Sequence, residues 1–151
     1  MSARIDPAEL RQVALRLKPG VILRMYQPIA EKVKRHILIA AAADRSLAFI
    51  INTRPSPFVA ARPEWMMRQL IMPRAEHMFM QHDSYIACHD TVGLPAAAEL
   101  ARLVCTGEGE ILGTLSQKLM GSIVSAAAGS SLIADRDMRL IVAGFPPGRS
   151  V

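Results

Sequence analysis

The sequence predicts a mainly β protein with helices (α+β), in which a small, curled antiparallel barrel has an N-terminal helix and C-terminal helices. Short apolar runs separated by turn residues recur over residues 19–93, as in small antiparallel barrels. A capped helical pattern precedes them, and helical spacing dominates residues 94–145. We expect residues 1–151 to form a single domain, with residues 146–151 as a frayed tail.

The N-terminal helix is predicted over residues 1–18. The segment Asp6-Pro7-Ala8-Glu9 combines an acidic N-cap, a proline at the first helical position and a glutamate placed for a capping box. Apolar residues follow at helical spacing, and Pro19-Gly20 ends the run. The first strand is predicted over residues 21–26, and the polar segment 27–34 is predicted to be a loop.

A β-hairpin is predicted within residues 31–53. Two apolar runs, 37–40 and 47–53, flank the polar turn 43–46. If the runs pair around this turn, the outer ends of the hairpin come together. The basic residues before the first run are then predicted to lie beside the hydroxyl residue that ends the second.

Two further strands are predicted after the hairpin. Two prolines in residues 54–58 forbid regular pairing and indicate a loop. Alternating side chains indicate a strand over residues 65–72, and a shorter one is predicted over residues 84–88.

The last third of the chain is predicted to be mainly helical. One helix is expected over residues 95–105, followed by an extended piece at 110–113. The threonine and glutamine of residues 114–117 have capping-box spacing and open the next helix. Asp135 is expected to cap a final helix, whose inward residues are Met138, Ile141 and Val142.

Composition limits the class of protein. Hydrophobic residues make up 51% of the chain and mean hydropathy is +0.23, which excludes a disordered chain. The longest uncharged stretch, residues 119–134, contains several serines and is shorter than the roughly 20 apolar residues of a membrane span. No secretory signal is visible, and Cys88 and Cys105 are isolated thiols. We therefore expect a cytoplasmic protein that does not bind the membrane.

Positive charge is concentrated in the first half of the chain. Residues 1–75 hold 13 Lys/Arg against 5 Asp/Glu, whereas residues 76–151 hold 5 against 8. The two halves carry net charges of +8 and −3. A basic half attracts polyanions, and nucleic acid is the first candidate.

The order of Glu31, Arg35 and Thr53 around an apolar hairpin resembles the MazF/PemK toxin ribonucleases. That family has an acidic residue in a loop, then an arginine that opens a strand, then a hydroxyl residue that ends the next strand. The segments Asp83-Ser84-Tyr85-Ile86 and Gly113-Thr114-Leu115-Ser116 look like later elements of the family. Where the family usually has a proline after the arginine, this chain has a histidine.

The resemblance covers about residues 19–130 and implies an SH3-like barrel. It also implies an endoribonuclease toxin that cleaves single-stranded RNA without a metal or another cofactor. A cognate antitoxin protein would neutralise it, and the toxin would be a homodimer.

Such cleavage requires a base for the 2′-hydroxyl proton and cations on the phosphorane. Arg35 offers a forked donor to phosphate oxygens, and Thr53 adds a neutral hydrogen bond. Either Glu31 or His36 is the candidate base. The candidate contacts to nucleic acid are Lys32, Lys34, Arg24 and Arg54.

The same residues allow a different interpretation. The cations of this segment are then a solvated loop, and Thr53 only ends a strand. The chain would then be a catalytically silent barrel of the same fold that binds nucleic acid or a protein partner.

The sequence contains two other clusters of residues that bear on function. Metal ligands crowd residues 77–90, but their spacing matches no standard zinc site and strand alternation separates them, so we expect no metal. Trp65 and the apolar residues after it provide more apolar side chains than one strand of a small barrel usually buries. This excess favours a dimer interface. That apolar set is Trp65, Met66, Met67, Ile71 and Met72.

Overall fold

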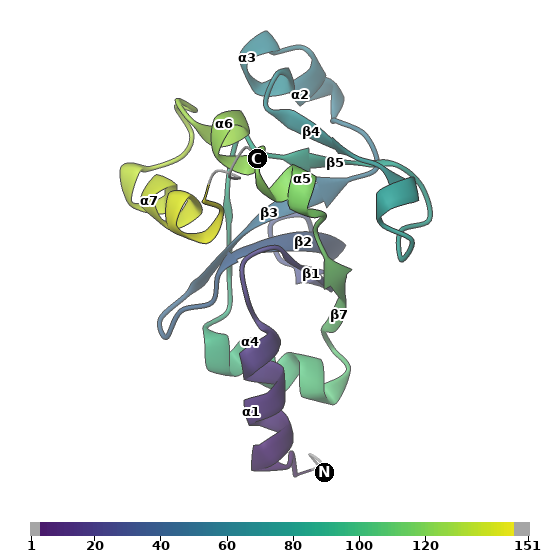
Figure 1. Cartoon of the computed structure of the whole chain (residues 1–151), viewed down its shortest axis with the longest axis vertical. Coiled ribbons are helices and arrows are strands. Elements are labelled where there is room, and N and C mark those ends of the chain that lie inside the picture. Colours follow the sequence, from purple (N-terminus) through teal and green to yellow (C-terminus); the bar gives the residue numbers. More distant parts are fainter. Residues whose placement is uncertain (1–3, 147–151) are drawn as a thin grey trace.

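The computed structural model describes residues 4–146. Over this range one curled sheet has helices on both of its faces (Figure 1). The strands are β1 (Val21–Gln27), β2 (Lys32–Ala40), β3 (Ser46–Asn52), β4 (Gln69–Met72), β5 (Ser84–Ala87), β6 (Val92–Leu94) and β7 (Glu110–Thr114). The helices are α1 (Pro7–Arg16), α2 (Pro57–Ala60), α3 (Pro63–Met66), η1 (Arg74–Glu76), α4 (Ala97–Thr106), α5 (Gln117–Met120), α6 (Ile123–Ala127) and α7 (Asp135–Gly144).

The sheet runs in the order β4-β5-β3-β2-β1-β7, and β6 pairs with β3 beside this path. Its strand pairings are antiparallel. Within residues 4–146, β4 and β7 stay at opposite ends of the order, so the curled sheet forms a half-barrel. The predicted α+β fold, with its curled antiparallel sheet and its helices at both ends of the chain, is confirmed.

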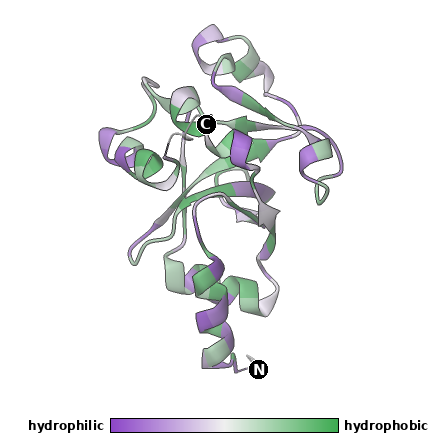
Figure 2. Ribbon diagram, in the orientation of Figure 1, coloured by the Kyte–Doolittle hydropathy of each residue, from purple (hydrophilic) through white to green (hydrophobic). Residues whose placement is uncertain are grey.

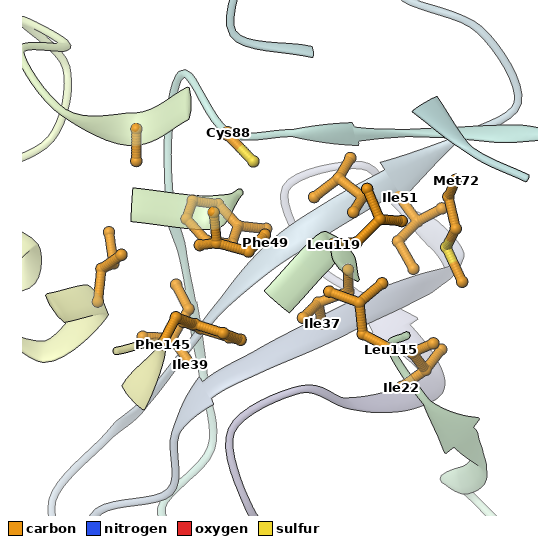
Figure 3. Close-up of a cluster of buried hydrophobic side chains, with 14 of the residues drawn as sticks. Ile22, Ile37, Ile39, Phe49, Ile51, Met72, Cys88, Leu115, Leu119 and Phe145 are labelled. Atoms are coloured by element: carbon orange, nitrogen blue, oxygen red, sulfur yellow. The ribbon is translucent and has the colours of Figure 1, made fainter. Parts of the chain in front are cut away.

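Strand alternation divides the core into two layers. Ile37 and Ile39 of β2 point to a cluster that includes residues of α5, α6 and α7, whereas Leu38 points to a cluster with α1 and α4. Figure 3 shows the first cluster, where Phe49 and Leu119 fill the space between the sheet and these helices. Because both faces of the central strands are covered there, most of β3 and residues 36–39 of β2 are buried.

Local signals account for several helix ends. Asp6 accepts a hydrogen bond from the backbone N–H of Ala8 at 2.9 Å, with Pro7 in the first turn, as the sequence predicts. The N-terminal helix shows both hydrophilic and hydrophobic residues in Figure 2, and its buried side packs on α4. Helix α4 ends at Gly107, whose φ of 84° lies in the left-handed region that favours glycine.

The predicted strand over residues 65–72 is wrong in its first half. Pro63 starts the short helix α3, and only Gln69–Met72 pairs with β5. Ser56 and Pro57 likewise open a helical turn, α2, inside the predicted loop. At these two positions proline occupies the first turn of a helix, where it is tolerated, and does not interrupt regular structure.

Three boundaries also differ from the prediction. The loop after β1 is shorter, since β2 already begins at Lys32. The N-cap of α5 is Ser116, whose Oγ accepts a hydrogen bond from the backbone N–H of Leu119. The single helix that was predicted here is divided into α5 and α6 near Gly121. Asp135 lies inside the first turn of α7 rather than at its cap, and Val142 is 48% exposed. Most of the predicted tail lies outside the described residues.

No helix within residues 4–146 combines the length and the apolar character that crossing a membrane requires.

Candidate nucleic-acid interface

A groove of about 290 Å³ lies at the outer end of the β2–β3 hairpin. One side is formed by Arg24 of β1 and by residues 32–35 of β2. The other side is formed by residues 51–53 and by Met80, His82 and Ser84, which precede or begin β5. Four strands or loops that are distant in sequence therefore meet at one site.

The hairpin register explains why Arg35 and Thr53 share this groove. Arg35 pairs with Ile51, and Thr53 follows two residues later, so strand alternation places it on the same side. Both residues line the groove. Arg35 and Thr53 therefore lie in one groove, as the sequence predicts. Their role in catalysis remains a prediction.

The lining of the groove concentrates positive charge. Its lining includes the cations Arg24, Lys32, Lys34 and Arg35, and none of its described lining residues is Asp or Glu. Arg24 lies directly opposite Arg35 across β1 and β2. The Nε atom of Arg35 is buried and has no hydrogen-bond partner among the described residues. An anion in the groove would satisfy this donor and offset the repulsion between the cations.

Lys34 is held in place at the mouth of the hairpin. Its ammonium donates a 2.7 Å hydrogen bond to Oδ1 of Asn52 on β3. Partial burial, together with the nearby charge of Lys32, lowers the pKa of Lys34 from its usual value. The lysine nevertheless lines the groove, where its remaining N–H donors are available to a ligand.

Neither predicted base lies in the groove. His36 is fully buried on the opposite side of β2 from Arg35, where its Nε2 lies 3.1 Å from Nε2 of Gln27. Burial lowers the pKa of His36 to about 4. Glu31 is exposed in the turn before β2, with a φ of 53°, and is not among the groove residues. The prediction that one of them joins Arg35 and Thr53 is corrected: alternation turns His36 away, and the turn keeps Glu31 outside.

The predicted contacts to nucleic acid divide in a similar way. Arg24, Lys32 and Lys34 line the groove, whereas Arg54 is exposed outside it. Arg54 follows the end of β3, where the chain leaves towards α2. Arg54 is therefore a surface arginine that follows the groove residue Thr53 in the sequence but does not line the groove.

No sequence pattern indicates that residues 80–84 contribute to the groove. Met80, His82 and Ser84 reach the groove because β5 pairs with β3, with Tyr85 opposite Asn52. This register brings the start of β5 beside Thr53. The sequence predicts a strand over residues 84–88, but no local pattern indicates which strand it pairs with. The contribution of this segment to the groove follows only from the pairing of β5 with β3.

His82 is oriented by its own loop. Its Nδ1 lies 2.8 Å from the carbonyl oxygen of Asp83 and 3.3 Å from Oγ of Ser84. A carbonyl oxygen only accepts hydrogen bonds, so this contact places the proton of a neutral imidazole on Nδ1. The other ring nitrogen, Nε2, then carries a lone pair.

The remaining histidines of this region have structural partners. His77 is buried, with Nδ1 2.8 Å from the carbonyl oxygen of Pro73, and its Nε2 accepts from the backbone N–H of Ser116 at 3.0 Å. His89 contacts Gln69 at 2.9 Å and stacks on Trp65. Within residues 4–146, no three His, Cys, Asp or Glu side chains gather as metal ligands would.

No protein-family model matches the sequence, and no curated protein matches it. The residues of the groove are therefore the basis for inferring a function.

Proposed function

We propose that this protein is an endoribonuclease that cleaves single-stranded RNA at the groove without a metal. Arg35 binds the phosphate and stabilises the charge that develops on it, and Thr53 adds a neutral hydrogen bond. Arg24, Lys32 and Lys34 hold the flanking phosphates. In this proposal the chain is a cytoplasmic toxin similar to the MazF/PemK family.

The observation that carries the proposal is the buried Nε of Arg35, which has no hydrogen-bond partner among the described residues, in a groove whose described lining holds no Asp or Glu. A structural arginine usually has a carboxylate or carbonyl partner, because a buried donor without one costs free energy. Arg35 lacks such a partner at Nε and faces a second arginine. Phosphate is the ligand whose charge and oxygen geometry fit this arrangement.

A second candidate is a catalytically silent barrel that binds nucleic acid or a protein partner through the same groove. The position of Glu31 and His36 favours it, because both predicted bases lie outside the groove. The two candidates share the phosphate contacts and differ in whether RNA is cut.

Two protein partners belong to the toxin proposal. An antitoxin with an acidic segment would complement the groove cations, and a neighbouring gene for a short acidic protein would support it. A homodimer would cover apolar side chains around the end strand β4, where Phe58, Met67 and Ile71 are 58%, 75% and 56% exposed. Light scattering at micromolar concentration tests the dimer, and a species of 16.5 kDa alone would count against it.

The test of cleavage uses purified protein, mixed-sequence RNA and a chelator. Wild type should cut the RNA, and Arg35→Ala should lower the rate by about 10²-fold or more. Thr53→Ala should cost less, since a neutral hydroxyl forms a weaker hydrogen bond than a guanidinium.

Arg54→Ala is the matched control and should cleave like wild type. RNA that is bound in a salt-sensitive way but left intact would favour the silent barrel. Cleavage only with an added divalent metal would refute the metal-free mechanism.

A further inference from the structure

The described lining of the groove contains one imidazole, and it belongs to neither of the bases that the sequence predicts. His82 is exposed at the groove, on the loop that leads into β5. Lysine and arginine are poor bases because they remain protonated at neutral pH, whereas imidazole titrates there. The described lining offers no carboxylate that would take the proton in its place.

We infer that His82 is the catalytic base that removes the 2′-hydroxyl proton of the bound RNA. The inference rests on the proposed function, because it assigns a step of that reaction. It replaces Glu31 and His36 with a residue that lies in the same groove as Arg35 and Thr53.

The contacts of the ring determine which nitrogen acts. Nδ1 donates to the carbonyl oxygen of Asp83 at 2.8 Å, so Nε2 holds the lone pair that a base needs. The Asp83 carboxylate has a partner of its own, since its Oδ1 accepts from the backbone N–H of Arg74 at 2.8 Å. A fixed tautomer and a fixed ring direction are what a positioned base requires.

The step balances without an oxidant, a reductant or a further co-reactant. His82 Nε2 takes the proton of the 2′-hydroxyl while the 2′-oxygen forms a bond to the adjacent phosphorus. The bond from phosphorus to the 5′-oxygen breaks, and the leaving oxygen takes a proton from water. The imidazolium returns its proton to the hydroxide left by that water. The products are a 2′,3′-cyclic phosphate and a 5′-hydroxyl, and Arg35 stabilises the charge on the phosphorane.

Charged groups around His82 matter for its pH dependence. The groove lining contributes the cations Arg24, Lys32, Lys34 and Arg35. The loop contributes Asp83, whose Oδ1 accepts from the backbone N–H of Arg74. It also contributes Arg74, whose Nε donates to the carbonyl oxygen of Met80 at 3.2 Å. The pH profile must therefore be compared with that of a variant that changes His82 alone.

The experiment compares wild type, His82→Ala and His89→Gln. His89 is the control because it is a histidine after the other end of β5, outside the groove lining. Cleavage of a short RNA is followed with pH in chelator, and affinity is measured with a 2′-O-methyl RNA that cannot react. Circular dichroism checks that each variant is folded.

His82→Ala should lose about 10² to 10⁴-fold in cleavage rate while its affinity for the inert RNA changes only a few-fold. Its profile should lack the rise with pH that imidazole gives near neutrality, and added imidazole should restore part of the rate. His89→Gln should behave like wild type.

Two results would overturn the inference, and they differ. If His82→Ala cleaves at the wild-type rate with the same pH profile, His82 is not the base and the proposed function stands. If wild type binds the inert RNA but leaves reactive RNA intact, the proposed function and the inference both fail.

Discussion

Arg24 of β1 and Arg35 of β2 lie directly opposite each other in the sheet, and both line the groove. Like charges at directly opposite positions of two strands destabilise a sheet. The folded protein tolerates this repulsion and also leaves Nε of Arg35 without a partner. Such local costs are typical of residues kept for binding rather than for folding.

Arg35→Met should therefore separate function from stability. Methionine keeps an apolar stem but removes the charge, so the free energy of unfolding should stay at or slightly above the wild-type value. RNA affinity should fall sharply. Urea unfolding and fluorescence anisotropy measure the two effects, with Arg54→Met as the control. A loss of more than about 1 kcal/mol in stability would instead mean that Arg35 has a structural role.

The groove cations should determine how RNA binding responds to salt. For single strands, each phosphate contact contributes about 0.7 to the slope of log K against log salt concentration. Lys32→Met and Arg24→Met should each reduce this slope by about that amount with inert RNA. Arg54→Met should leave it unchanged, and an equal effect at all three positions would indicate a diffuse charge effect instead of a groove.

His36 should make the protein less stable in acid. Its pKa is about 4 in the folded state and near 6.5 in a free chain, so the unfolded state binds the proton more readily. Stability from this residue is complete above pH 6.5 and declines as pH falls towards 4, by about 3 kcal/mol over the range.

His36→Gln provides the test, because glutamine can keep a polar contact with Gln27 but does not titrate. Urea unfolding between pH 7 and pH 4 should show a flatter dependence for the variant than for wild type. Parallel curves would mean that other groups cause the acid sensitivity.

Gly144→Ala should destabilise the packing of α7 on the sheet. A Cβ at this position would lie 2.9 Å from the backbone carbonyl oxygen of Ile39 and 3.1 Å from Cβ of Pro19. Because a backbone oxygen cannot move aside cheaply, the free energy of unfolding should fall by about 1 to 3 kcal/mol. Gly109→Ala is the control, since its nearest neighbours would be 3.7 Å away. Equal thermal stability of the two variants would contradict the close approach.

Local patterns in the sequence were enough to predict the fold class and the central hairpin. Asp6 and Pro7 start α1, and the run of apolar residues on each side of the turn at Asp44 specifies β2 and β3. These signals depend on neighbours in the chain. The helical turns after Ser56 and at Pro63 were not predicted, because a proline can either interrupt a strand or occupy the first turn of a helix. The residues that flank these prolines did not distinguish the two possibilities.

The candidate site was only half predictable for a different reason. Arg35 and Thr53 belong to one hairpin, whose register follows from its turn. His82 joins them through the pairing of β5 with β3, which brings together residues about thirty positions apart. Strand alternation excludes His36 once Arg35 is assigned to the groove. The predicted loop ends at residue 34 and the predicted apolar run begins at residue 37, so neither pattern specifies the faces of Arg35 and His36, which β2 contains because it begins at Lys32.

The buried ring of His77 affects the groove although it does not line it. Through Pro73 and Ser116 it joins the start of the loop that bears Met80 and His82 to the start of α5, and Arg74 closes that loop on Asp83. One wall of the groove is thus preorganised before any ligand arrives. A ligand that enters loses its own conformational freedom, but the protein has little entropy left to lose in this loop.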